Sequence, residues 1–212
     1  MVGEQRPNRL VVEGKDDKHT IIHLMRRHSV DWDADERAPF IRPAESVQML
    51  LDSLTASVKS YERFGVVIDA DVDVAGRWRS VRNRLSQIGL ELPPTPSPEG
   101  VVADGITPGR RTGVWLMPDN TLSGNLEDFL ATLVPADDAC WPYAREAATE
   151  AKQRGAKFGD VDRLKAEIHT WLAWQQEPGV PFGTAVTACY LRHDSEVALR
   201  FVAWFRRLFF DE

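Results

Sequence analysis

The sequence lacks several features that mark familiar protein classes. Its 212 residues include only two cysteines, Cys140 and Cys189, which lie far apart without metal-ligand spacing. A disulfide framework or a zinc module is therefore not expected. No apolar run approaches the roughly 20 residues that span a bilayer. The first residues, MVGEQRPNR, lack the apolar segment of a signal peptide. These absences predict a cytoplasmic protein with no membrane anchor.

Excess positive charge and a glycine-rich phosphate loop are also missing. The chain has 32 acidic residues against 26 Lys and Arg, which gives a formal net charge of −6. An acidic protein does not attract nucleic acid through its global field. Any contact with a phosphate backbone must then come from a local basic patch or from metal ions held by the acids. The lack of a Walker-type loop argues against a nucleotide-binding α/β protein.

What the sequence does contain is an alternation of apolar strands and amphipathic helices. Strands are predicted in RLVVEG, APFIRPA, FGVVID, GVVADGI and TGVWLMPD, and helical periodicity fills most of the intervals. Alternation of this kind predicts an α/β fold with a parallel sheet flanked by helices over residues 1–135. Residues 136–212 are predicted to be mostly helical. Because no linker precedes them, we expect a helical extension packed on the sheet domain as a single structural unit.

Two of the apolar strands end on acidic residues. Glu13 closes LVVEG, and Asp69 and Asp71 close VVIDAD. Ligands of a parallel sheet bind beyond the carboxyl ends of its strands, so these acids are expected at one edge. Crowded carboxylates without His or Cys favour Mg²⁺ or Mn²⁺. The alternative is that such acids cap a helix or form a turn, which applies most directly to Asp17 and Asp73.

The stretches VVEGKDD and VVIDADVD together resemble the Toprim superfamily, which includes topoisomerase and primase catalytic domains, recombination mediators and OLD-type nucleases. Glu13 with its following glycine, and the D-x-D pair Asp69 and Asp71, match the superfamily pattern. Asp17 stands four residues after Glu13, where OLD-type members often carry another acid. The chain has no primase-like zinc module and no tyrosine in a topoisomerase-like context, so the OLD-type branch is the nearest. The resemblance covers roughly residues 9–135. It implies a Rossmann-like Toprim sheet and a Mg²⁺ or Mn²⁺ site at these four acids.

A third stretch, VWLMPDNTLSGNLEDFL, is similar to a segment of small stand-alone Toprim-like proteins of uncharacterised function. Glu127 would then be the late acid that OLD-type enzymes use for a second metal. Asp73, Asp119, Asn120 and Asp128 are additional candidates for the site. The alternative is that PDN is a plain turn and that Glu127 and Asp128 favour the N-terminal dipole of a helix.

Basic residues flank the predicted acidic site. Arg77 and Arg79 lie on the predicted helix that follows the D-x-D pair and are candidates for holding a phosphate backbone. Their alternative is a solvated helix face paired with nearby acids. Lys15, beside Glu13, and Lys165, which resembles a lysine in the tail of the small Toprim-like proteins, are candidate catalytic residues. For Lys165 the alternative is simple helix solvation.

Together these features predict a metal-dependent, nuclease-like protein that carries out phosphoryl transfer on nucleic acid. Glu13 would bind metal or act as a general base, and the sequence does not separate these roles. The rival hypothesis is a non-catalytic Toprim-fold module that binds nucleic acid or a protein partner. Fold analogy alone cannot name the substrate.

The last predicted helix bears on partners. OLD-type enzymes join their Toprim domain to an ATPase in one chain, whereas this sequence contains no Walker-type loop. An apolar face on the helix predicts a homodimer or docking onto a separate ATPase, because exposed apolar patches mark interfaces. The alternative is that the helix completes the core. The residues of this face and its margins are Val197, Phe201, Trp204, Phe205, Leu208, Phe209 and Phe210.

Overall fold

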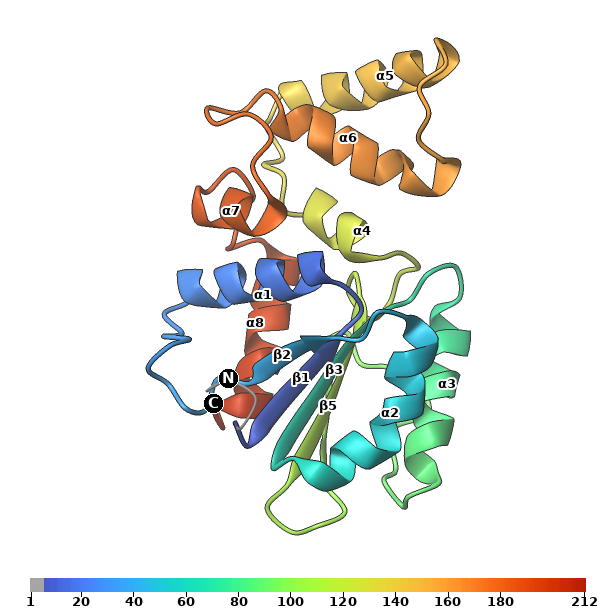
Figure 1. Ribbon diagram of the computed structural model, residues 1–212, viewed down its shortest axis with the longest axis vertical. Helices are drawn as coiled ribbons and strands as arrows, with labels where there is room; N and C mark the ends of the chain where they lie inside the picture. Colours follow the sequence, from blue (N-terminus) through green and yellow to red (C-terminus); the bar gives the residue numbers. More distant parts are fainter. Residues whose placement is uncertain (1–5) are drawn as a thin grey trace.

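A five-stranded sheet with strand order β2-β1-β3-β5-β4 organises the computed structural model, which describes residues 6–212 (Figure 1). The strands are β1 (Asn8–Val12), β2 (Phe40–Pro43), β3 (Arg63–Asp69), β4 (Val101–Asp104) and β5 (Arg111–Met117). The first three strands and β5 run parallel, whereas β4 pairs with β5 in the antiparallel direction. The predicted α/β class is confirmed.

The antiparallel β4 departs from the all-parallel sheet that alternation predicts. Only residues 105–110 separate β4 from β5. A parallel pair needs a crossover of a dozen or more residues, so this short connection forces a hairpin.

Helices cover both faces of the sheet. They are α1 (Lys15–Arg27), α2 (Val47–Ser60), α3 (Val74–Ser86) and, at the chain end, α8 (Glu196–Phe209). Side chains alternate across a strand, so Val66 packs with α2 and α3 while its neighbour Val67 packs with α1 and α8. Two apolar clusters result, one on each face, and the cluster on the α1 and α8 face continues beyond the sheet into residues 126–191.

The remaining helices lie beyond the edge at which the parallel strands end (Figure 1). They are α4 (Leu126–Ala131), α5 (Cys140–Gln153), a 3₁₀ turn η2 (Asp160–Asp162), α6 (Arg163–Leu172) and α7 (Phe182–Thr187). The α5–α6 pair stands away from the sheet, and α7 lies against α1. The sequence did not predict α7, because six residues are too few for a helical period to show.

The apolar face of α8 is buried inside the chain. Phe210 is 8% exposed, and five apolar residues of the helix are 0% exposed: Phe201, Trp204, Phe205, Leu208 and Phe209. The apolar face is therefore not exposed, and the alternative, completion of the core, is correct. The homodimer or separate ATPase partner stays a prediction. Within residues 6–212, no helix has the length and apolar character needed to cross a membrane.

Candidate functional site

The ends of β1 and β3 bring two of the predicted acids together. Glu13 follows the last residue of β1, and Asp69 is the last residue of β3. The backbone N–H of Asp69 donates a hydrogen bond of 2.8 Å to Glu13 Oε1. Because β1 and β3 are adjacent parallel strands, this bond fixes the Glu13 carboxylate across the end of its neighbour.

Asp17 adds a third carboxyl from the first turn of α1. One of its oxygens accepts a hydrogen bond of 3.1 Å from the N–H of Gly14, so the capping alternative describes part of its role. The side chain is only 6% exposed, and its other oxygen, Oδ1, has no hydrogen-bond partner. Burial, with the charges of Glu13 and Glu127, raises the pKa of Asp17 to about 7.

Asp69 is perturbed further. Burial is the main cause, and the neighbouring carboxylates add to it, so that the pKa of Asp69 rises to about 9. Its Oδ1 also lacks a hydrogen-bond partner. Burial likewise raises the pKa of Glu13, although the hydrogen bond from the Asp69 N–H opposes this shift. These three carboxyls therefore favour either a bound proton or a bound cation.

Asp71 and Glu127 complete the cluster but are paired with basic side chains. Asp71 forms an ion pair with Arg77. Glu127 lies 3.3 Å from the amino group of Lys165, which also reaches Asp16 at 3.7 Å. Each outer acid thus already has a counter-ion from the protein, unlike the orphaned oxygens of the inner acids.

A pair of loops holds these outer acids in place. The N–H of Asp71 donates to the carbonyl of Gly124 at 2.9 Å, and the N–H of Gly124 donates back at 2.7 Å. Asp71 sits at a φ of 53°, in the left-handed region that aspartate tolerates better than most residues. The link joins the loop after β3 to the segment that starts α4, and so couples the D-x-D pair to Glu127.

The carboxylates of this cluster have the chemistry that a hard divalent cation prefers, but they are not arranged at coordinating positions. Across residues 6–212, no three Asp, Glu, His or Cys side chains are arranged to hold a metal ion. The available donors are carboxylate oxygens, two of them buried and without a partner, which suits Mg²⁺ or Mn²⁺. For Asp71 and Glu127 to join such a site, they would have to leave Arg77 and Lys165.

The additional candidates from the sequence have local structural partners. Asp73 caps α3 by accepting a hydrogen bond of 2.8 Å from a backbone N–H in its first turn. Asp119 accepts bonds from the turn that follows it. Asn120 is buried and bonds the N–H of Leu116 at 2.8 Å. Asp128 bonds the N–H of Asn125 at 2.9 Å at the start of α4. Their turn and capping alternatives account for these contacts.

The remaining basic candidates differ in their surroundings. Lys15 and Arg79 are exposed on α1 and α3. Lys165 reaches the cluster from α6, so the helical extension contributes a cation to the acidic edge of the sheet. Simple solvation on a helix surface does not describe Lys165, because its amino group bridges two acids from other helices.

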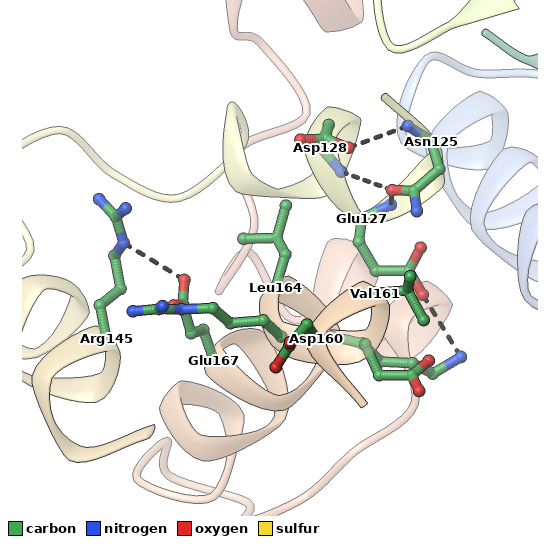
Figure 2. Close-up of a pocket in the computed structure, with 11 residues that line it drawn as sticks. Asn125, Glu127, Asp128, Arg145, Asp160, Val161, Leu164 and Glu167 are labelled. Atoms are coloured by element: carbon green, nitrogen blue, oxygen red, sulfur yellow. Dashed lines mark hydrogen bonds and ion pairs between the residues drawn. The ribbon is translucent and has the colours of Figure 1, made fainter. Parts of the chain in front are cut away.

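A groove lined by Glu127 and Lys165 opens between α4 and the η2–α6 segment (Figure 2). Its volume is about 410 Å³. Beneath it, the buried Glu167 is held by Arg163 at 2.9 Å and by Arg145 at 3.3 Å. The sequence analysis missed these three residues. The i, i+4 spacing of Arg163 and Glu167 was the available signal, but Arg145 joins them only through the packing of α5 on α6.

One comparison with known proteins gives a match. Residues 7–210 fit the model of a family described as a protein of unknown function, DUF3226. No curated protein and no solved structure matches the chain. The matched range includes both the acidic edge of the sheet and the helices that close over it. The chain belongs to the DUF3226 family.

Proposed function

We propose that the protein carries out metal-dependent phosphoryl transfer on nucleic acid, as a nuclease does, with Mg²⁺ or Mn²⁺ at the acidic edge of the sheet. The observation that carries this proposal is the pair of carboxyls of Asp17 and Asp69, each with a buried oxygen that has no hydrogen-bond partner. The resemblance of the surrounding motifs to the Toprim superfamily supports the same chemistry.

Burying several carboxylates together is unfavourable unless a cation compensates them. Glu13, Asp17 and Asp69 would hold the ion, with Asp71 and Glu127 as further ligands. A bound divalent ion can activate a water molecule and stabilise charge on a phosphodiester. This assigns a role to a cluster that is otherwise costly to the fold.

The two ion pairs suggest how the basic residues would take part. If Asp71 and Glu127 served as metal ligands, Arg77 and Lys165 would lose their present partners. Both basic side chains would then be able to contact phosphate oxygens beside the site. Lys15 and Arg79, exposed on α1 and α3 on opposite faces of the sheet, are further candidates for phosphate contact.

A second candidate function is a non-catalytic module that binds nucleic acid or a protein. The observation that favours it is the absence, across residues 6–212, of three acids already arranged to hold a metal. The pairing of both outer acids with basic side chains points the same way. The two candidates differ in whether metal binding leads to cleavage.

The deciding experiment is a cleavage assay on plasmid DNA, linear DNA and RNA with Mg²⁺ or Mn²⁺. Glu13→Gln and Asp69→Asn should each lower the rate by about 100-fold or more, the loss expected when a group that stabilises transition-state charge is removed. Asp104→Asn is the matched control, since Asp104 pairs with the first residue of β5 at the opposite end of the sheet.

The outcomes separate the two candidates. Cleavage that survives in Asp69→Asn would show that the activity lies elsewhere. Metal binding seen by calorimetry, without cleavage of any substrate, would favour the binding module.

A further inference from the structure

A second pocket lies on the α2 side of the sheet, between the edge strand β2 and α2. Its volume is about 110 Å³. Arg9 and Arg42 reach it from neighbouring strands, and Ser57 and Tyr61 reach it from α2 and its end. The other residues of its lining are Val11, Ala44, Met49 and Ser53.

The charge of this pocket is opposite to that of the protein as a whole. Its lining has two arginines and no carboxylate among the residues that the structure describes, in a chain with a net charge of −6. Each of four other surface cavities includes at least one Asp or Glu. Because two arginines and no described acid line this cavity, its local potential should attract an anion.

The arginines of the pocket are positioned in different ways. The guanidinium of Arg9 lies 4.5 Å from the centre of the Phe40 ring and 4.6 Å from that of Tyr61, so two aromatic rings fix its plane. Arg42 is exposed. It lies beside Val11 in the β1–β2 register. One guanidinium is thus held rigidly by stacking, and the other can move onto a ligand.

Several donors around the cavity are not used within the protein. In the part of the chain that the structure describes, the guanidinium of Arg42 and the hydroxyls of Ser57 and Tyr61 make no hydrogen bond or ion pair with other residues. Ser53 differs, because its hydroxyl donates to the carbonyl of Leu50 at 2.9 Å. Donors converge on the pocket, so a ligand that only accepts hydrogen bonds suits it.

The size of the pocket limits the ligand. A volume of about 110 Å³ corresponds to roughly four water molecules at about 30 Å³ each. That is room for one tetrahedral oxyanion. Arginine suits phosphate, because its planar fork can bind two oxygens at once.

We infer that this pocket binds a phosphate group, either free or at the end of a polynucleotide, through Arg42, Arg9, Ser57 and Tyr61. The site is distinct from the acidic cluster and needs no metal ion. It nevertheless lies close to that cluster, because Val11 lines it and Glu13 stands two residues further along the same side of the chain, a rise of about 7 Å. A terminal phosphate held here would place the adjoining chain near the acidic edge.

Calorimetry with inorganic phosphate in EDTA, at an ionic strength held constant with chloride, tests the inference. The wild-type protein should bind, and Arg42→Gln should weaken binding about tenfold or more, since it removes a charge-assisted contact. Ser57→Ala should weaken it by a smaller factor. Arg154→Gln is the matched control, because Arg154 is an exposed arginine at the C-terminal cap of α5 whose side chain pairs, within residues 6–212, only with Glu150.

Two short single-stranded oligonucleotides, with and without a terminal phosphate, distinguish the sources of the ligand. Preference for the phosphorylated one, lost in Arg42→Gln, would assign the pocket to a polynucleotide end. Binding of inorganic phosphate alone would assign it to the free anion. Undetectable phosphate binding at millimolar concentration, or unchanged affinity in Arg42→Gln, would overturn the inference. Asp69→Asn should bind phosphate normally, so failure of the metal proposal is seen separately.

Discussion

At the scale of single residues, Asp69 shows what the acidic cluster does to the fold. Its pKa of about 9 in the folded protein lies far above the ordinary value of 3.8. Between these two pH values the folded state binds a proton more tightly than the unfolded chain does. The free energy of unfolding of the metal-free protein must therefore fall as pH rises through this range. Asp17, with a pKa of about 7, acts in the same direction.

We accordingly expect Asp69→Asn to stabilise the metal-free protein at alkaline pH. Asparagine removes the titrating charge, and the oxygen it keeps has no partner to lose. Urea unfolding in EDTA should show a gain on the order of 2 kcal/mol near pH 8.5 and little change near pH 5. If the free energy of unfolding of the variant fell with pH as steeply as that of the wild type, the charge of Asp69 would not be what destabilises the folded protein.

Divalent metal should reverse this penalty. An ion that binds only the folded state stabilises it by about 2.7 kcal/mol at 100 times its Kd. Mg²⁺ or Mn²⁺ should thus raise the melting temperature of the wild type, and Asp69→Asn or Asp71→Asn should reduce that rise. Asp104→Asn, at the opposite end of the sheet, should respond as the wild type does. Absence of any response at millimolar metal would refute the proposed metal site.

At the scale of elements, Asp73 separates a helix cap from a metal ligand. It lies two residues from Asp71, yet its carboxylate accepts the N–H of Gly76 and so begins α3. Asp73→Ala should lower the free energy of unfolding by about 1 kcal/mol, whereas Asp73→Ser, another good cap, should lose little. Neither change should alter the metal-induced shift in melting temperature. A lost shift in both variants would place Asp73 in the site.

The elements also show which parts of the structure were predictable. The strand ends at Glu13 and Asp69 follow from short apolar runs, and α1 to α3 follow from their periodicity, because both signals are local. The direction of β4 depends on the length of a connection, and α7 is too short to show a period. The site divides in the same way. The acids at the strand ends could be named from the sequence, but the pairing of Lys165 with Glu127 arises only when α6 folds over α4.

Across the whole molecule, the last helix joins the two halves that the sequence suggested. Gly65 and Gly113 lie opposite each other on β3 and β5. A Cβ at either glycine would come within 3 Å of Leu208. The two glycines thus make a flat place on the sheet where α8 can lie close. One helix that covers the sheet, α8, therefore lies outside residues 1–135. A boundary at residue 135 does not delimit a unit with its own complete core.

This arrangement predicts that a chain ending at Asp194 will not fold. The truncation removes α8 and, with it, Phe201, Trp204, Phe205, Leu208 and Phe209, all fully buried. Each such side chain contributes about 1.5–3 kcal/mol when buried. Their sum, on the order of 10 kcal/mol, is comparable with the 5–15 kcal/mol that stabilises a typical protein.

The test is thermal unfolding followed by circular dichroism, with a chain ending at Phe210 as the matched control. The control loses only Asp211 and Glu212, whose exposed ion pairs contribute about 0–1 kcal/mol each. It should melt cooperatively near the wild-type temperature, whereas the chain ending at Asp194 should show no cooperative transition. If that shorter chain did melt cooperatively, the sheet would have a sufficient core without α8, and the acidic edge could then be studied on the smaller fragment.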